Sequence, residues 1–149
     1  MSTHYRGTQQ EKDALDVYIK LSRAAESVEA RVNRHLKDYS LTWSQFGVLE
    51  ALFHLGPLHQ QDLATKILKS SGNLTLVIDN LEKRGLVERQ RNQCDRRFIT
   101  ICLSQEGHQL ISNIFPVHVA QVVDAIGVLT LDEQQQLAQL CRKLGLAQD

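Results

Sequence analysis

Two groups of polar side chains between residues 69 and 97 suit the binding of nucleic acid. The first group consists of short hydroxyl and amide side chains, Ser70, Ser71, Asn73 and Thr75. An asparagine amide can pair with adenine, and a hydroxyl can reach a base edge or a phosphate. The second group is basic and comprises Lys69, Arg84, Arg89, Arg91, Arg96 and Arg97. Their spacing favours phosphate binding beside base contacts, although a merely solvated charged hairpin and a simple N-cap role for Ser71 are alternatives.

The local sequence pattern predicts which elements carry these groups. Apolar residues at i, i+3, i+4 and i+7 predict a helix over 71–84, and Gly85 ends it (Leu74, Val77, Ile78, Leu81). The period then changes to two over 87–91 and again over 98–103, which predicts two strands. Residues 92–97 form the polar tip between them. A helix with a small polar face before a ribbon with a basic tip predicts a winged helix-turn-helix that binds DNA.

The flanking residues are predicted to be helical. A helix over 11–39 follows a loosely attached segment 1–10, and its excess apolar surface predicts a second copy of the chain, with packing on its own domain as the alternative. Capping boxes at Thr42 and Thr130 open two further helices. Leu58 is expected in a very short strand, residues 60–68 in a helix, and Ser104 as the cap of another helix that Pro116 should kink or interrupt.

The expected fold is therefore mainly α with a small β-wing. Its order is a long helix, a helix, a short strand, a helix, the recognition helix, two wing strands and two more helices. We divide the chain into an N-terminal helix of residues 1–40, a DNA-binding lobe of residues 41–103 and C-terminal helices of residues 104–149, all within one compact chain.

Composition narrows the class of protein. The 149 residues have a net charge of +0 and contain no apolar run near the roughly 18 residues that span a bilayer, so we expect a cytoplasmic protein without a membrane partner. Three separated cysteines predict neither a disulfide framework nor a zinc site. The six histidines form no metal or catalytic motif, and no Gly-rich phosphate loop is present. We expect no enzyme activity, no metal and no cofactor.

The residues themselves resemble the MarR (multiple antibiotic resistance regulator) family of bacterial transcription factors along nearly the whole chain. The resemblance is strongest over LTWSQFGVLEAL, QQDLATKILKSSGNLTLVIDNLEKRGLVERQRN and CDRRFITICLSQEG. It implies a homodimer formed by the N- and C-terminal helices, bound to a pseudo-palindromic operator. It also implies repression in most cases, with release of DNA on binding a phenolic molecule or on cysteine oxidation.

The resemblance further implies individual roles. Arg97 would insert into the minor groove with Arg96 near phosphate, and Lys69, Arg89 and Arg91 would contact phosphates. Asp95 would hold the wing by pairing with one of three arginines, Arg84, Arg89 or Arg91. A winged helix that binds only other proteins is the rival interpretation, and a steep salt dependence of binding would distinguish DNA binding from it.

Two sets of residues are candidates for a response to small molecules. An aromatic effector could stack on His35, Tyr39, Trp43 and Phe46, for which packing in the core is the alternative. Cys94 at the wing tip could be oxidised or alkylated, for which an incidental surface thiol is the alternative. Cys102 and Cys141 lie on apolar-patterned segments and are expected to be inert packing residues.

Overall fold

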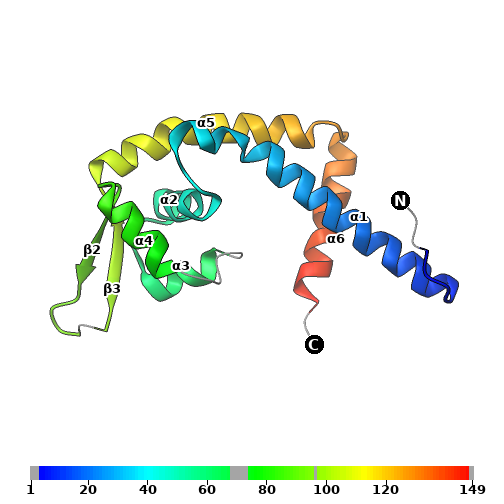
Figure 1. Ribbon diagram of the computed structural model, residues 1–149, viewed down its shortest axis with the longest axis horizontal. Helices are drawn as coiled ribbons and strands as arrows, with labels where there is room; N and C mark the ends of the chain where they lie inside the picture. The colour runs from blue at the N-terminus through cyan, green and yellow to red at the C-terminus, as the bar shows by residue number, and fades with distance from the viewer. Residues whose placement is uncertain (1–3, 68–73, 96, 148–149) are drawn as a thin grey trace. The chain divides into compact units, whose positions relative to one another are not determined.

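The fold is mainly helical with a three-stranded sheet, which confirms the predicted class. The computed structural model describes residues 4–67, 74–95 and 97–147. Its elements are α1 (Gln9–Val32), the 3₁₀ helix η1 (Arg34–Tyr39), α2 (Trp43–Leu55), β1 (Leu58–His59), α3 (Gln60–Lys66), α4 (Leu74–Lys83), β2 (Val87–Arg91), β3 (Ile99–Leu103), α5 (Gln105–Ile126) and α6 (Leu131–Leu146) (Figure 1). Five residues with predicted roles lie outside the described part: Lys69, Ser70, Ser71, Asn73 and Arg96.

The chain divides into two compact units. One unit consists of residues 35–119, and the other of residues 1–34 together with 120–149. The boundaries differ from the predicted 40 and 103, because the first half of α5 contributes Ile111 and Ile114 to the core of the 35–119 unit. We call these the DNA-reading unit and the terminal-helix unit below.

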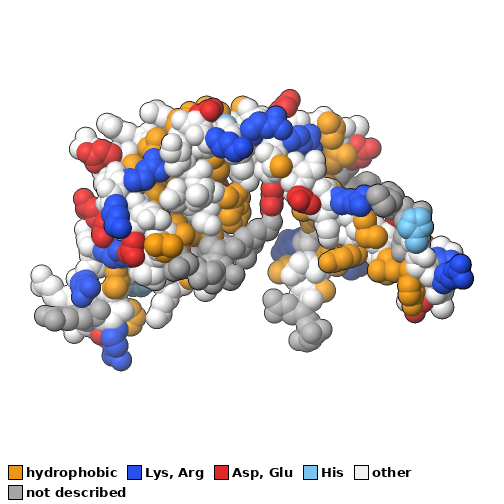
Figure 2. All heavy atoms as spheres, in the orientation of Figure 1, with side chains coloured by type: hydrophobic (Ala, Val, Ile, Leu, Met, Phe, Trp, Pro, Cys, Tyr) orange, Lys and Arg blue, Asp and Glu red, His pale blue; other side chains and the backbone are white. Residues whose placement is uncertain are grey.

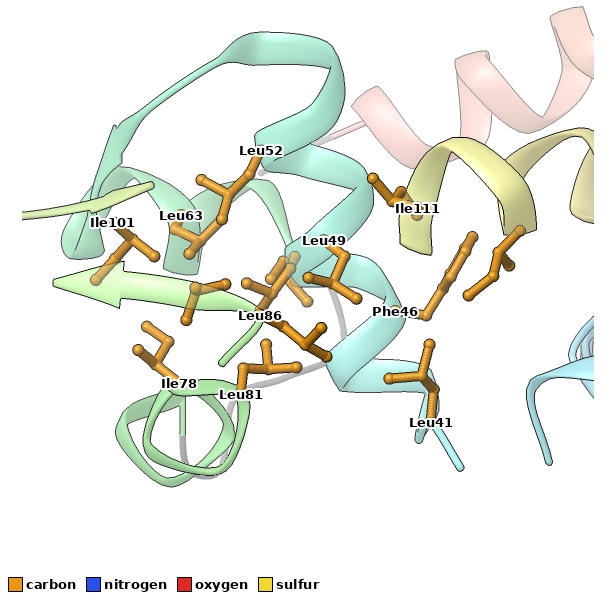
Figure 3. Close-up of a cluster of buried hydrophobic side chains, with 14 of the residues drawn as sticks. Leu41, Phe46, Leu49, Leu52, Leu63, Ile78, Leu81, Leu86, Ile101 and Ile111 are labelled. Atoms are coloured by element: carbon orange, nitrogen blue, oxygen red, sulfur yellow. The ribbon is translucent and has the colours of Figure 1, made fainter. Parts of the chain in front are cut away.

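The DNA-reading unit has a closed hydrophobic core. Figure 3 shows side chains from α2, α3, α4, β3 and α5 converging on it. The largest of them are fully buried: Val48, Leu49, Leu63, Ile78, Leu81, Val87, Ile101, Ile111 and Ile114. Full burial of each such side chain contributes about 1.5–3 kcal/mol. The core thus fixes α4 against the sheet, and the apolar stripe predicted for α4 is confirmed by its buried Ile78 and Leu81.

The sheet is antiparallel with strand order β1-β3-β2. Arg89 of β2 lies opposite Ile101 of β3, and Leu58 of β1 pairs with the same Ile101. The predicted short strand at Leu58 is therefore confirmed. Side chains alternate across a strand, and that of Ile101 is on the face that packs on the core, where it is fully buried. The β2–β3 ribbon extends beyond this core.

Two glycines permit close turns between α4, β2 and α5. Gly85 has a φ of +71°, a left-handed conformation that ends α4 as predicted. A Cβ atom at Gly107 would lie within 1.9 Å of the Leu86 carbonyl oxygen, so only glycine fits where α5 passes this backbone. The Ser104 hydroxyl accepts a hydrogen bond from the Gly107 N–H at 3.0 Å, which confirms Ser104 as the helix cap.

The first helix corrects the prediction at both ends. It begins at Gln9, inside the segment expected to be loose, because Thr8 and Glu11 form a capping box. It ends at Val32 rather than Tyr39, with Asn33 as its C-cap, and a 3₁₀ helix follows. The apolar spacing continues past Asn33 because Leu36 joins the core of the DNA-reading unit, where it is buried. Apolar spacing over six residues did not distinguish these two kinds of helix.

The remaining helix ends agree better with the sequence. Capping boxes at Thr42–Gln45 and Thr130–Glu133 are confirmed. Pro116, in contrast, does not interrupt its helix, since α5 runs from Gln105 to Ile126 without a break. Among the described residues no single helix is long and apolar enough to cross a membrane; α5 and α6 meet that criterion only as a pair bent by 100°.

Candidate nucleic-acid interface

Helices α3 and α4 form a helix-turn-helix with an exposed polar position on the second helix. Leu63 of α3 and Ile78 of α4 are fully buried, so both helices are seated on the same core. Thr75, in the first turn of α4, is exposed. Of the four predicted recognition residues, Thr75 is the one that the structure describes, and it lies on the outer surface as base contact requires.

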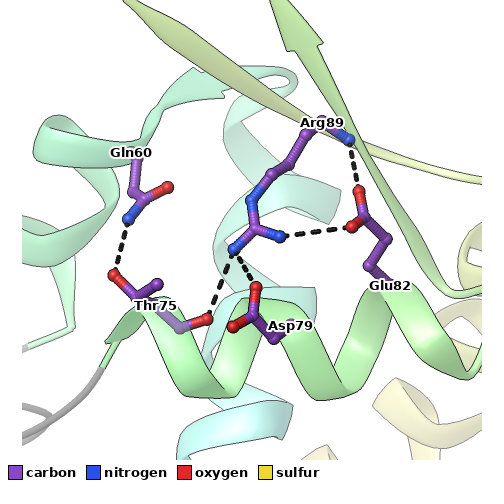
Figure 4. Close-up of polar contacts among 5 residues, drawn as sticks. All are labelled: Gln60, Thr75, Asp79, Glu82 and Arg89. Atoms are coloured by element: carbon purple, nitrogen blue, oxygen red, sulfur yellow. Dashed lines mark hydrogen bonds and ion pairs between the residues drawn. The ribbon is translucent and has the colours of Figure 1, made fainter. Parts of the chain in front are cut away.

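Thr75 is held by two neighbouring elements (Figure 4). Its hydroxyl oxygen accepts a hydrogen bond from Gln60 Nε2 at 3.1 Å, at the start of α3. Its backbone carbonyl accepts one from Arg89 Nη2 of β2 at 3.3 Å. The helix-turn-helix and the wing are therefore joined at Thr75, which the sequence predicts to contact DNA.

Arg89 faces α4 rather than solvent. Its guanidinium forms ion pairs with Asp79 at 2.6 Å and Glu82 at 3.2 Å, and its backbone N–H donates to Glu82 as well. Only 18% of its side chain is exposed. The prediction placed this side chain on phosphate; in the structure two carboxylates and a carbonyl occupy its donors.

Arg84 also has a structural position. It donates from Nη1 to the Ser40 carbonyl at 2.7 Å and from Nη2 to the Tyr39 carbonyl at 3.1 Å. Ser40 has a φ of +53°, a conformation that non-glycine residues adopt at a cost. Arg84 therefore links the end of the recognition helix to the turn between η1 and α2, instead of pointing to a phosphate.

The wing tip is organised by its own side chains. Asn92 Oδ1 accepts from the Cys94 N–H at 2.8 Å, and Asp95 Oδ1 accepts from the Arg97 N–H at 3.0 Å. The Arg97 guanidinium donates hydrogen bonds to the same carboxylate from Nε and from Nη2, each at 3.1 Å. The hydrogen bonds from Arg97 hold the pKa of Asp95 below its ordinary value; those of the side chain contribute most, and that of the backbone N–H contributes less.

The predicted partner of Asp95 was wrong. Arg84, Arg89 and Arg91 were the candidates, but Asp95 pairs with Arg97, two residues away. The reason is local: Arg84 and Arg89 have other partners, the Ser40 carbonyl and the Asp79 carboxylate, whereas the tight turn brings Arg97 onto Asp95. Arg97 nevertheless keeps 89% of its side chain exposed, as groove insertion needs. Figure 2 shows basic side chains around the free end of this ribbon.

A concavity lies beside the wing, between its base and the start of α3. Its lining is contributed by β1, α3 and the residues that lead into β3 (His59, Gln60, Gln61, Asp62, Arg97, Phe98, Ile99). The rings of His59 and Phe98 lie 5.6 Å apart, and His59 Nδ1 is 3.3 Å from the Thr100 hydroxyl. No sequence pattern predicts a role for His59 or Gln60, because the residues that they contact are distant in the chain.

The proposed effector residues occupy different environments. His35 and Phe46 join a ring cluster with His118 of α5, with centroids 4.6 Å apart for Phe46 and His118 and 5.5 Å apart for the two histidines. Tyr39 packs on the core and Trp43 is 36% exposed. Both ring nitrogens of His35 and Nδ1 of His118 are buried without a hydrogen-bond partner among the described residues. Burial lowers the pKa of His118, and the nearby His35 lowers it further.

The cysteines differ in exposure. Cys94 is exposed at the wing tip, as predicted from its position. Cys102 is half-buried, and burial together with Glu88 raises the pKa of its thiol. Cys141, expected to pack, is exposed on α6. In the described part of the chain, no three His, Cys, Asp or Glu side chains are grouped to hold a metal ion.

A buried helix-turn-helix with an exposed polar position, followed by an arginine-tipped ribbon, defines a winged-helix DNA-binding regulator. The family model described as "MarR family" matches residues 41–99. The transcriptional regulator MhqR of Bacillus subtilis strain 168 is 35% identical over 133 residues, covering 89% of this chain and 92% of that protein. The chain belongs to the MarR family, whose members are transcriptional regulators rather than enzymes.

Solved structures agree with the fold. Sco3205 of Streptomyces coelicolor, a MarR family transcriptional regulator solved in complex with DNA, is 26% identical with a TM-score of 0.82, over 98% of this chain and 94% of that chain. BpsR of Bordetella bronchiseptica, whose DNA binding is regulated by 6-hydroxynicotinic acid, is 26% identical with a TM-score of 0.79, over 87% and 98% of the two chains. This chain is accordingly a MarR-type DNA-binding transcriptional regulator.

Proposed function

We propose that this protein is a cytoplasmic repressor that binds a pseudo-palindromic operator as a homodimer. It releases the operator when a small aromatic acid, phenol or quinone binds, or when Cys94 is modified. The observation that carries the proposal is the joint exposure of Thr75 on α4 and Arg97 on the wing within one rigidly packed unit. The first suits a major groove and the second the adjacent minor groove.

The residues outside the described part complete the proposed contact. Ser70, Ser71 and Asn73 precede Thr75 in the sequence, and Lys69 and Arg96 are the basic residues that we propose for phosphate contacts. Arg91 is exposed on β2 and suits a phosphate contact. Arg84 and Arg89 have structural partners instead, so we assign them to positioning.

The terminal-helix unit supports a homodimer. α6 has no buried residue in the single chain, and its leucines are exposed (Leu131, Leu137, Leu140, Leu144, Leu146). Figure 2 shows hydrophobic side chains at the surface of this unit. An apolar surface of this kind normally marks a protein interface. A second copy of the chain also supplies the second recognition helix, which must lie about 34–36 Å from the first to meet successive major grooves.

A binding titration tests this function. A duplex selected by the protein from fragments of its own genome is titrated by fluorescence anisotropy between 50 and 200 mM salt. We expect specific binding whose affinity falls about a thousand-fold over that range, with a dimer by light scattering. Affinity that is independent of salt, or equal for unrelated DNA, would favour a winged helix that binds only proteins.

The ring cluster supports an aromatic effector. His35, Phe46 and His118 offer flat apolar faces together with buried imidazole nitrogens that can hydrogen-bond to a carboxylate or phenol. Tyr39 and Trp43 adjoin η1 and α2 and complete the proposed contact set. BpsR, a relative with the same fold, is regulated by such an aromatic acid, 6-hydroxynicotinic acid.

Calorimetric titration with 6-hydroxynicotinic acid and with salicylate tests the effector. We expect binding by the wild type that His35→Phe weakens at least ten-fold, because the ring shape remains but both nitrogens are lost. His108→Phe, in a ring pair outside the proposed site, is the matched control. An absence of heat at millimolar ligand would exclude this class of effector.

A quinone treatment of the wild type and of Cys94→Ser tests the cysteine. If quinone abolishes DNA binding in both proteins, modification of Cys94 is excluded as the cause of release.

A further inference from the structure

The contact between Gln60 and Thr75 indicates which hydrogen-bonding role the Thr75 hydroxyl has toward DNA. The described side chain of Gln60 donates to the Thr75 hydroxyl oxygen, and a hydroxyl has one hydrogen and two lone pairs. The Gln60 amide occupies one lone pair, and among the described residues the hydroxyl hydrogen of Thr75 has no acceptor. This hydrogen can therefore be donated to DNA, beside the one lone pair that stays free.

We propose that Thr75 determines specificity by donating a hydrogen bond to an acceptor on the operator, and that Gln60 and Arg89 position it without contacting DNA. This inference rests on the proposed operator binding and adds the chemistry of one contact. In the major groove, guanine and thymine present only acceptors, through O6, N7 and O4; adenine presents the N7 acceptor beside the N6 donor, and cytosine presents only the N4 donor. Guanine or thymine is accordingly expected opposite Thr75.

Arg89 positions the backbone while Gln60 orients the hydroxyl. Arg89 spans α4 from the Thr75 carbonyl to Glu82, and Asp79 lies between them. One arginine thus fixes two successive turns of the recognition helix to strand β2. Its single positive charge lies against two carboxylates, so it contributes no net positive charge toward phosphate (Figure 4).

Base preference measured by selection from a random-sequence pool tests the role of Gln60. The operator position that Thr75 contacts is identified by two variants: Thr75→Val should lose the base preference at that position, and Thr75→Ser should keep it. There we expect the wild type to prefer guanine or thymine over cytosine by about ten-fold. Gln60→Glu should reverse this preference. The introduced carboxylate can only accept, so the Thr75 hydroxyl donates its hydrogen to it. The Thr75 oxygen is then left to accept a hydrogen bond from the cytosine N4 amino group. Gln61→Glu, which adds the same charge one residue away, should keep it.

The sign of two further effects tests the role of Arg89. If Arg89 positions α4, Asp79→Asn weakens operator binding several-fold; if Arg89 contacts phosphate, the same change frees it, removes a negative charge and strengthens binding. Arg89→Lys keeps the charge but not the planar fork, so we expect a loss of about ten-fold with an unchanged salt slope. Arg91→Gln, the matched change on the exposed side chain of the same strand, should lower the slope by about one.

The outcomes separate this inference from the function on which it rests. An unchanged base preference in Gln60→Glu, or stronger binding by Asp79→Asn, overturns the inference while selective binding by the wild type leaves the proposed function intact. If Thr75→Val relaxes no position, Thr75 makes no base contact and the inference again fails. A wild-type protein that enriches no sequence from the pool refutes both. Circular dichroism of each variant at the binding temperature verifies that it is folded.

Discussion

The two units of this protein differ in what completes them. The DNA-reading unit buries leucine and isoleucine side chains from η1, α2, α3, α4, β3 and α5 in a core of its own. Among its described residues, the terminal-helix unit buries few side chains: Val32 in α1, Ala125 in α5 and none in α6. Since burial of apolar surface is the main stabilising term, the first unit has a core of its own, whereas the second leaves apolar side chains exposed that the proposed homodimer would cover. In the proposed homodimer, reading DNA and pairing two copies are thus separate physical tasks.

The largest effect should come from breaking the terminal-helix unit. Leu140 is 63% exposed in the single chain, so Leu140→Glu removes no core contact but places a charge in the proposed dimer interface. We expect a monomer by light scattering and a loss of operator affinity of about a hundred-fold or more, because one recognition helix is lost from the complex. Gln135→Glu, on the same helix, should remain a dimer. A dimeric Leu140→Glu protein would show that α6 lies outside the interface.

The next largest effect should come from the core of the other unit. Leu81 is fully buried in α4, and Leu81→Ala should lower the free energy of unfolding by about 2–5 kcal/mol through lost burial and a residual cavity. Leu55→Ala, on the half-exposed end of α2, should cost far less. Chemical denaturation of both variants measures the difference. Equal losses would contradict a closed core in the DNA-reading unit.

A smaller effect, on binding alone, should come from the wing. Arg97→Ala should weaken operator binding by more than ten-fold and lower the salt slope by about one, while folding survives because the side chain is 89% exposed. Asp95→Asn keeps the charge on Arg97 and loses only its alignment, so its effect on affinity should be smaller. Unchanged affinity of Arg97→Ala in an anisotropy titration would remove the wing from the DNA contact.

Local patterns in the sequence predicted the elements better than the contacts between them. The stripe of α4, the stop at Gly85 and the alternation in β2 and β3 depend on neighbours in the chain, and the structure confirms them. The capping box of Thr8 and Glu11 is equally local, since its two residues lie three positions apart in the sequence. Partners chosen by the fold could not be predicted in the same way. Arg84 reaches carbonyls more than 40 residues away, and Gln60 meets Thr75 across 15 residues.

The structure agrees with the sequence on the exposure of predicted site residues, and differs from it on the pairing of two arginines. Thr75, Arg97 and Cys94 lie on the surface as the sequence suggested. Arg84 and Arg89 looked equally available in a basic stretch, but a nearby carbonyl or carboxylate redirects each of them. Charge along a sequence therefore predicts where phosphate can bind, but not which cations remain free for it.

The smallest effect concerns acid, and it is confined to the DNA-reading unit. Burial lowers the pKa of His118 in the folded state, so the unfolded chain binds more protons as the pH falls below about 6.5. The stability contributed by neutral His118 is complete above that pH and declines as the pH falls through the folded pKa. Glu50 acts in the opposite direction, because burial raises its pKa and the folded state then gains protons first. Denaturation between pH 7 and pH 5 should therefore show less acid loss in His118→Phe and more in Glu50→Gln, and parallel curves for the two variants would contradict burial as the cause.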